Sequence, residues 1–465
     1  MGCGCRSLCP GGSCNAVRSG AVRVKILQVI PDFGLGGIQK AGCVLAETMV
    51  RAGHQVLLLA EKTGPRFQPS CSWHRVMQGP RREALAEAAC EFSPDVIHLH
   101  APGYPEDLIR GLAGWPGEKP PLLVTTPVFG RPPEDRRLLA LTRTCCVGVF
   151  TFYRLGRWLK QQPAEMVRNG IGYVPLTPFQ PPPAEVDRDA ARRALAIPEG
   201  TFVFGRVGRS QGGKWHPCYP QIIDAVLSAD PGAQWISIGF PDNLRLARLR
   251  ERWGDRFRSF PETTDYQFIA GVLSAMDVQL FWSQHGECFA STICEAAGMG
   301  TPTIAGVNPC QDNGQVEQVL EGVTGELVGT PAQAIAVLLR LGSDRSRLQP
   351  LRASTRQHAW TRWHVERVTA DLLQLYEYWR SGKECSYVEV MLREHHELMR
   401  NYRRKVAALK AEGSLRHSAW EMALWSAESW TLFSAARRVK PYVRKVLDYG
   451  EHLQRHGMHR GSYAG

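Results

Sequence analysis

Two glutamates, Glu287 and Glu295, are the carboxylates of this sequence that are best placed to do chemistry. They stand on either side of an expected turn between a strand that ends near Trp282 and a helix that begins near Thr292. The first can point into an open cleft, and the second lies in about the first turn of the helix. A carboxylate there can accept hydrogen bonds from a ribose diol while the backbone N–H groups of the helix start hold a phosphate. The spacing alone is weakly specific, because helix capping also explains many such pairs.

A pair of histidines, His98 and His100, stands on the strand expected over residues 95–100. Both side chains leave a regular strand on the same side, because side chains alternate along a strand. Such a pair can bind zinc, but the sequence places no third ligand group near it. A structural histidine satisfied by hydrogen bonds is the other alternative.

A glycine-rich turn with Gly34, Gly36 and Gly37 follows the first expected strand and opens a helix. Glycines let the backbone approach a ligand closely. The turn has an alternative interpretation as a dinucleotide site, with Glu61 as the acid that binds ribose. This alternative fails because Gln39 stands where the third glycine of the dinucleotide pattern belongs.

The elements that must position these residues alternate between strands and helices. Buried strands are expected at 24–30, 55–60, 95–100, 122–126 and 145–151, and after a proline-rich segment at 201–207, 234–239, 277–282 and 303–305. Helices are expected up to about residue 51, at 222–229 and at 292–299. This alternation predicts an α/β protein with two Rossmann-like parallel-sheet domains that face each other across a cleft. Ligands bind such sheets beyond the carboxyl ends of the strands.

Five parts make up the predicted organisation of the chain. They are a leader rich in cysteine and glycine (1–21), a first sheet domain (22–174), a proline-rich linker (175–184), a second sheet domain (185–380) and a helical extension (381–465). The leader is expected to be disordered, and a metal-binding tail is the alternative.

The helical extension contains a pattern typical of a coiled coil. Residues at a 4-3-4-3 spacing form this seam: Val388, Leu392, His395, Met399, Tyr402, Val406 and Leu409. The seam would join copies of the chain into a homo-oligomer, and a helix that packs on its own domain explains it equally well. Farther on, the basic residues at 437–445 could touch anionic lipid or form a solvated helix face.

The segment from Gly286 to Ala296 resembles the E-x7-E segment of retaining GT-B glycosyltransferases, in particular those of glycosyltransferase family 4. The likeness covers roughly residues 24–378, and its specificity comes from the order and spacing of many positions across two domains. Further matching positions are Val29-Ile30-Pro31, Gly34, Gly36-Gly37, His98-Leu99-His100, Asn169-Gly170-Ile171, Val207-Gly208-Arg209, Lys214, Gly300 to Ala305, Gly314, Glu317, Gly322, Thr324-Gly325 and Leu327-Val328.

The resemblance implies a role for individual residues. Arg209 and Lys214 would clamp the donor diphosphate and stabilise the leaving nucleotide, although each alone would be an ordinary surface cation. Glu287 would contact the donor sugar hydroxyls, Glu295 would bind the nucleotide ribose, and His100 would reach the donor sugar. The implied donor-binding set also includes Gly36, Gly37, Phe289, Ala290, Ser291 and Thr292.

The function implied by the resemblance is retaining transfer of a hexose from a nucleotide diphosphate-sugar to an acceptor hydroxyl, in glycan, polysaccharide or glycolipid biosynthesis. No metal or other cofactor is expected, and the first domain would take a glycan or a lipid-linked acceptor. The alternative is a non-catalytic GT-B protein that binds nucleotide sugar or assists a partner transferase. The sequence departs from the family pattern at Trp215, Cys288, Ala290, Asn313 and Gly172, which affects the identity of the donor more than activity.

The charge and composition of the chain limit its partners and its compartment. The 465 residues carry a net charge of +12, distributed as +8 (21 − 13) in residues 1–175, −2 (20 − 22) in 176–380 and +6 (15 − 9) in 381–465. We interpret the basic surplus as a contact surface for an anionic membrane or a phosphate-bearing acceptor, and no motif supports nucleic acid binding. Scattered cysteines and the lack of a run of about 18 apolar residues favour the cytoplasm, with at most a peripheral position on the membrane.

Overall fold

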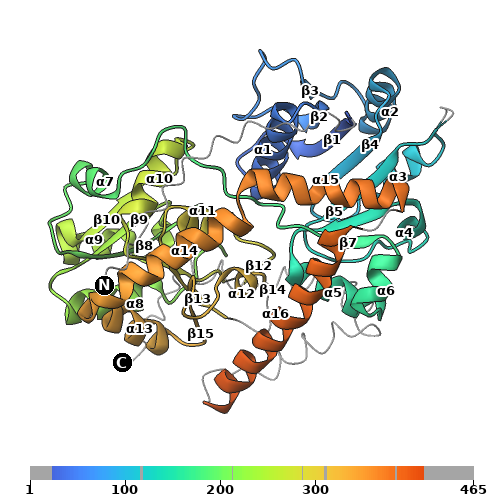
Figure 1. The fold of residues 1–465 in the computed structure, drawn as a ribbon. Helices are drawn as coiled ribbons and strands as arrows, with labels where there is room; N and C mark the ends of the chain where they lie inside the picture. The colour runs from blue at the N-terminus through green and yellow to red at the C-terminus, as the bar shows by residue number, and fades with distance from the viewer. Residues whose placement is uncertain are drawn as a thin grey trace, which may run out of the picture.

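The computed structural model describes residues 23–412 except 116–118, 212, 285, 308–311 and 383–384. Two parallel β-sheets lie side by side, and each is covered by helices (Figure 1). This confirms the predicted α/β class with two Rossmann-like domains. The predicted leader and the basic residues at 437–445 lie outside the described residues.

The first sheet has parallel strands in the order β3-β2-β1-β4-β5-β6-β7. These are β1 (Lys25–Asp32), β2 (Gln55–Lys62), β3 (His74–Val76), β4 (Val96–Ala101), β5 (Leu122–Pro127), β6 (Arg143–Cys146) and β7 (Ile171–Tyr173). Ile26 and Ile30 of β1 pack in one core, and Leu27 and Val29 pack in the core on the opposite face. Because both faces are covered, residues 26–30 appear in the sequence as a nearly continuous apolar run, interrupted by the buried Gln28.

The second sheet has parallel strands in the order β10-β9-β8-β11-β13-β15. These are β8 (Phe202–Val207), β9 (Ala233–Ile238), β10 (Phe257–Phe260), β11 (Val278–Phe281), β13 (Thr303–Gly306) and β15 (Gly325–Val328). A short parallel pair, β12 (Gly286–Glu287) and β14 (Asp312–Asn313), lies outside this sheet.

Helices follow the strands in both domains. The first domain has α1 (Gly37–Arg51), α2 (Arg81–Phe92), α3 (Glu106–Leu112), α4 (Leu138–Leu141), α5 (Val149–Leu159) and α6 (Pro163–Arg168). The second has α7 (Arg188–Ala194), α8 (Tyr219–Ala229), α9 (Leu246–Trp253), α10 (Tyr266–Ala275), α11 (Ser291–Gly298), α12 (Gln315–Gln318), α13 (Pro331–Ser343) and α14 (Leu348–Arg362), and the chain continues with α15 (Val365–Ser381) and α16 (Ser386–Ala411).

One predicted strand, 145–151, is wrong over its second half. The strand β6 ends at Cys146, and α5 begins at Val149. At the start of this helix the Gly148 N–H donates to the Thr151 hydroxyl at 3.2 Å. A short apolar run does not distinguish a buried strand from the start of a buried helix, so the sequence pattern could not resolve this boundary.

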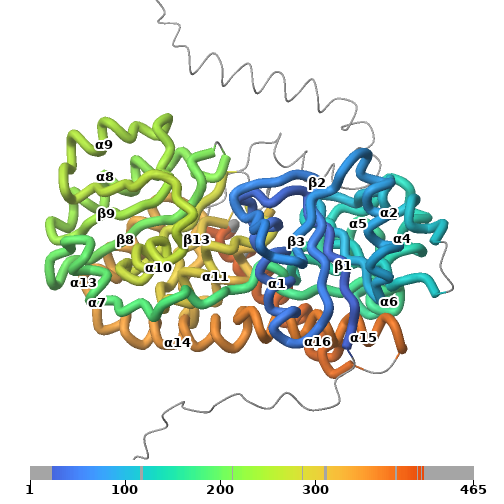
Figure 2. The backbone as a smooth tube through the Cα atoms, turned by 90° about the horizontal axis from the view of Figure 1, so that it is seen from above, coloured from blue at the N-terminus to red at the C-terminus, as the bar shows by residue number. Residues whose placement is uncertain are grey.

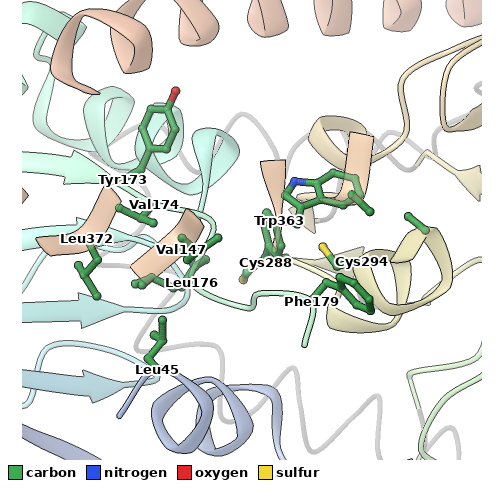
Figure 3. Close-up of a cluster of buried hydrophobic side chains, with 14 of the residues drawn as sticks. Leu45, Val147, Tyr173, Val174, Leu176, Phe179, Cys288, Cys294, Trp363 and Leu372 are labelled. Carbon is green, nitrogen blue, oxygen red and sulfur yellow. The ribbon is translucent and has the colours of Figure 1, made fainter. Parts of the chain in front are cut away.

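The chain crosses between the domains twice, and the two crossings lie side by side. In the first, within the predicted linker, the N–H of Phe179 donates to the carbonyl of Trp363 at 2.7 Å. In the second, the N–H of Val365 donates back to the carbonyl of Phe179 at 2.9 Å. Figure 3 shows these crossings within one cluster of buried side chains that includes Leu45 of the first domain and Cys294 of the second. A continuous apolar core therefore joins the two domains.

After the second crossing, α15 and α16 return to the first domain. Helix α15 contacts α1 and β5, and α16 contacts α5, α6 and β7 (Figures 1 and 2). The seam residues His395, Met399 and Leu409 are buried within this chain. Of the two explanations for the 4-3-4-3 spacing, the structure therefore shows a helix that packs on its own chain. None of the helices in the described residues combines the length and the apolar character needed to span a membrane.

Candidate functional site

A cleft of about 720 Å³ lies between the two domains. The first domain contributes the start of α1, and the second contributes the loop after β8, the start of α11 and residues 262–269. The second crossing contributes residues 364–366. The cleft therefore lies beyond the carboxyl ends of the strands, where open parallel sheets bind ligands.

Two cations stand on the loop that follows β8. The Lys214 ammonium lies 2.9 Å from both carboxylate oxygens of Glu287. The Arg209 guanidinium lines the cleft and forms no ion pair with any described residue, while the Arg209 carbonyl accepts a hydrogen bond from the Trp215 indole at 2.8 Å. The loop thus presents one neutralised and one available positive charge to a ligand.

Glu287 is positioned by the short pair of β12 and β14. Gly286 has φ +72°, and a Cβ there would lie 2.1 Å from the carbonyl oxygen of Asp312, so only glycine fits this turn. The turn presents Glu287 to the cleft beside Lys214.

The start of α11 faces the cleft. Ser291 and Thr292 line the cleft, so the free backbone N–H groups of this first turn are available to an anion. Glu295 is the fifth residue of α11, close to the position that the sequence predicted, and it also lines the cleft. Phe289 and Ala290 complete the lining on this side.

Lys40 is a residue of the site that the sequence interpretation missed. It stands on the first turn of α1 and forms an ion pair with Glu295 across the cleft. Its ammonium also lies 4.1 Å from the centre of the Tyr266 ring, a cation–π contact. The spacing in the sequence could have identified this residue. Lys40 follows Gly36 and Gly37 by one helical turn, so it faces the same edge of the sheet.

The glycine-rich turn before α1 is held by Asp32. The Gly34 N–H donates to one Asp32 carboxylate oxygen at 2.6 Å, and the Gln39 amide donates to the other at 3.1 Å. A Cβ on Gly37 would meet no atom within 4 Å. Gly36 and Gly37 both line the cleft, so the turn leaves open space for a ligand.

His100 is the predicted site residue that does not line the cleft. It is buried, and its ring lies 4.0 Å from that of His98, as expected for two side chains on one face of β4. His98 is satisfied by the hydroxyls of Tyr376 at 2.6 Å and Thr126 at 2.7 Å, so it is a structural histidine. Burial lowers the pKa of His100 to about 4, which keeps its imidazole neutral near pH 7.

No group of three or more metal-binding side chains occurs in the described residues, so the zinc alternative for the histidine pair gains no support from neighbouring ligands. The Nε2 atom of His100 has no hydrogen-bond partner among these residues. Its role in a reaction stays a prediction.

The departures from the family pattern are accommodated by packing. The Cys288 thiol lies 3.3 Å from a carboxylate oxygen of Asp312 and does not line the cleft, so it does not narrow the space for a ligand. Burial raises its pKa to about 11. Gly172 lies under α15, where a Cβ would already be 3.4 Å from Trp379 and a larger side chain would displace this helix.

The two parallel sheets, the cleft between them and the return of α15 define the GT-B fold, and comparison with solved structures confirms it. A glycosyltransferase from Rickettsia africae aligns with a TM-score of 0.60 at 15% identity, over 78% of this chain and 100% of that one. Sucrose-phosphate synthase from Thermosynechococcus elongatus has the same TM-score and coverage at 18% identity. Anabaena HepE, solved in complex with UDP-glucose, has a TM-score of 0.55 at 16% identity, over 77% of this chain and 100% of HepE. These likenesses establish the fold.

A more local sequence similarity links the chain to curated proteins. The D-inositol 3-phosphate glycosyltransferase of Mycobacterium tuberculosis is 33% identical to it over 203 residues. The match covers 41% of this chain and 40% of the mycobacterial protein. The chain thus spans about two fifths of the length of the curated relatives it matches. No family model matches the chain.

Proposed function

We propose that this protein is a retaining glycosyltransferase of family 4 that transfers a hexose from a nucleotide diphosphate-sugar to an acceptor hydroxyl. One observation carries the proposal. Arg209, Lys214, Glu287 and Glu295 come from separate positions in the sequence, and all four line the same cleft between the two domains. The similarity to a mycobacterial glycosyltransferase and the fold shared with a protein solved with UDP-glucose also support it.

The charges of the cleft suit a departing nucleoside diphosphate. Arg209 and Lys214 would offset the negative charge that develops on the diphosphate when the bond to the sugar breaks. The free N–H groups at the start of α11 would hold a phosphate in the same region. Preorganised charges of this kind act on the leaving group without the need for a metal or another cofactor.

The two glutamates would fix the donor in place. Glu295 would accept hydrogen bonds from the ribose diol, and Glu287 would accept them from the hydroxyls of the sugar. Each has a lysine partner that the donor must share or displace. Catalysis then depends on positioning of the donor and the acceptor and on stabilisation of the leaving group.

The first domain would bind the acceptor, a glycan or a lipid-linked sugar, on its side of the cleft. Its basic charge and that of the extension fit a cytoplasmic protein that rests on an anionic membrane surface. Assembly into a homo-oligomer through the C-terminal helices is a further part of this proposal.

The test is a panel of UDP-, GDP- and ADP-sugars incubated with the purified full chain, with release of the nucleotide as the readout. We expect one donor to be hydrolysed slowly without an acceptor and faster with one, with retention of the anomeric configuration in the product. Nucleotide binding without turnover of any donor, with glycan and lipid-linked acceptors present, would overturn the proposal in favour of a non-catalytic sugar-nucleotide-binding protein.

A further inference from the structure

The strand β14 pairs with β12, the short strand that carries Glu287 into the cleft. In this pair Gly286 lies opposite Asp312, and Glu287 lies opposite Asn313. The carbonyl of Glu287 also accepts a hydrogen bond from the N–H of Gly314 at 2.7 Å, directly after β14. Two strands of this length outside the main sheet are not stable by themselves. The place of Glu287 in the cleft therefore depends on what holds β14.

One contact that holds β14 comes from the first domain. Arg154 of α5 forms an ion pair with Asp312, and its side chain is 10% exposed. The same guanidinium donates to the carbonyl of Phe129 at 3.0 Å, so Arg154 is also fixed within its own domain. At the start of α5, the N–H of Val149 donates to Glu317 of α12 at 2.5 Å. Helix α5 thus holds both β14 and the short helix that follows it.

Another contact on β14 comes from α16. The side chains of Tyr402 and Asn313 share a hydrogen bond, and the Tyr402 ring packs edge-on against Phe150 of α5, with the ring centres 5.7 Å apart. The amide oxygen of Asn313 accepts from Gln315 at 3.0 Å, which fixes the orientation of this buried side chain. Asn313 is one of the positions at which the sequence departs from the family pattern. Its amide links β14 to a helix outside the two sheets.

Helix α16 is itself anchored on both domains. Toward its start, the hydroxyl of Tyr387 donates to the carbonyl of Tyr173 in the first domain at 3.1 Å. Toward its end, Lys405 forms an ion pair with Glu321 of the second domain at 2.5 Å, and Leu409 is buried in an apolar cluster with residues of both domains. Figure 1 shows α5 and α16 next to the short strand pair. Both helices therefore reach β14 only while the two domains lie against each other in this arrangement.

We propose that Arg154 and Tyr402 are positioning residues for Glu287, which they hold in place through β14. The inference rests on the proposed function, in which Glu287 binds the hydroxyls of the donor sugar. Neither positioning residue lines the cleft, so both act through the strand pair and not on the donor. The arrangement of the domains thus controls how tightly the sugar part of the donor is held. A small displacement of Glu287 is enough to lose its contact with the sugar.

The test uses two conservative variants of the full chain, Tyr402→Phe and Asp312→Asn. The first removes a hydroxyl and retains the ring, and the second removes a charge and retains the shape of the side chain. Calorimetry measures binding of the UDP-, GDP- or ADP-sugar that the unmodified chain binds most tightly, and of the corresponding nucleoside diphosphate. We expect each variant to bind the sugar nucleotide about tenfold more weakly and the nucleoside diphosphate with unchanged affinity, because only the contact of Glu287 with the sugar is lost.

Two controls separate positioning from a general loss of stability. Tyr387→Phe removes a hydroxyl of the same helix that bonds the first domain, and it should bind both ligands as the unmodified chain does. In a Glu287→Ala background, Tyr402→Phe should not weaken binding of the sugar nucleotide any further, because the group that it positions is absent. A merely structural role of Tyr402 would weaken binding of both ligands, and would do so in either background.

The outcomes distinguish this inference from the proposed function. Unchanged affinity of both variants for the sugar nucleotide overturns the inference, and so does a further loss in the Glu287→Ala background. Full affinity of Glu287→Ala for the sugar nucleotide overturns it together with the sugar-binding role of Glu287. A donor that binds and is never turned over would overturn the transferase function alone, since the binding measurements do not require turnover.

Discussion

Lys40 of α1 and Glu295 of α11 form an ion pair across the cleft, although they stand in different sheet domains. The Lys40 side chain is 15% exposed and that of Glu295 is 7% exposed, so both charges are largely removed from water. A charge in such surroundings is costly without its partner. The pair therefore couples the two domains at the position where Glu295 is proposed to bind a ribose.

This coupling predicts the result of a double-mutant cycle. Lys40→Met and Glu295→Gln should each destabilise the protein, because each leaves one charged or polar group buried without its partner. The double variant should be less destabilised than the sum of the two, with a coupling of about 1–3 kcal/mol. Chemical unfolding of the unmodified protein, the two single variants and the double variant at one pH measures this coupling free energy. Strictly additive effects on the free energy of unfolding would contradict an energetic link between the domains.

The assignment of Glu295 to the ribose predicts that replacing this residue removes the preference for a ribonucleotide over its 2′-deoxy form. The unmodified protein should bind its preferred nucleoside diphosphate about 10-fold or more better than the 2′-deoxy form, because the diol donates hydrogen bonds to a buried carboxylate. Glu295→Ala should weaken binding of the ribonucleotide and leave the 2′-deoxynucleotide almost unaffected. Calorimetric titration of both nucleotides with both proteins provides the measurement. Equal losses for the two nucleotides would show that Glu295 acts on something other than the diol.

The leaving-group assignment concerns Arg209. Its replacement in Arg209→Ala should lower kcat by about 100- to 1,000-fold, the effect typical of removal of one group that stabilises developing negative charge. The effect on KM should be much smaller, because the charge on the diphosphate grows as the bond breaks. Arg248→Ala, at an exposed arginine of α9 that does not line the cleft, is the matched control. A similar loss in both variants, or a pure KM effect in Arg209→Ala, would refute the assignment.

Much of this architecture is predictable from the sequence because its strands are buried on both faces. Apolar runs such as Leu57-Leu58-Leu59 belong to strands with a core on each side, and glycines mark the turns that lead to the cleft. Short edge strands escaped prediction. The strand β3 (His74–Val76) is only half-buried, so it lacks the apolar run that identifies β2 beside it.

Contacts between distant segments account for the rest of what the sequence could not predict. The partner of Glu295 is Lys40, in the other domain, and no local pattern links the two. The packing of α16 on the first domain has the same origin, because an apolar seam on a helix does not specify whether it packs on its own chain or on a second copy. His100 illustrates a third limit, since a position at a strand end does not determine whether a side chain reaches the adjoining cleft.

Glu317 of α12 is a buried carboxyl group at the start of α5, in the other domain. One of its oxygens accepts a hydrogen bond from the N–H of Val149 at 2.5 Å, and the other has no partner among the described residues. Burial raises its pKa from the usual value of 4.5 to about 8, although the backbone N–H groups of α5 and the positive charge of Arg362 oppose this shift. The carboxyl group is therefore largely protonated in the folded protein at neutral pH and ionised in the unfolded chain.

The sign of the resulting pH dependence follows from that difference. The folded state binds the extra proton between pH 4.5 and about 8, so the contribution of Glu317 to stability is complete below this window and is lost as the pH rises through it. Glu317→Gln, which mimics the protonated form, should gain stability relative to the unmodified protein by up to about 1.4 kcal/mol for each pH unit in the window. Urea unfolding of both proteins at pH 5, 6, 7 and 8 measures this difference. The control is Glu251→Gln, at an exposed glutamate of α9, whose free energy of unfolding should change with pH as that of the unmodified protein does. If the free energy of unfolding of Glu317→Gln also has the same pH dependence as that of the unmodified protein, the buried carboxyl group does not titrate in this range.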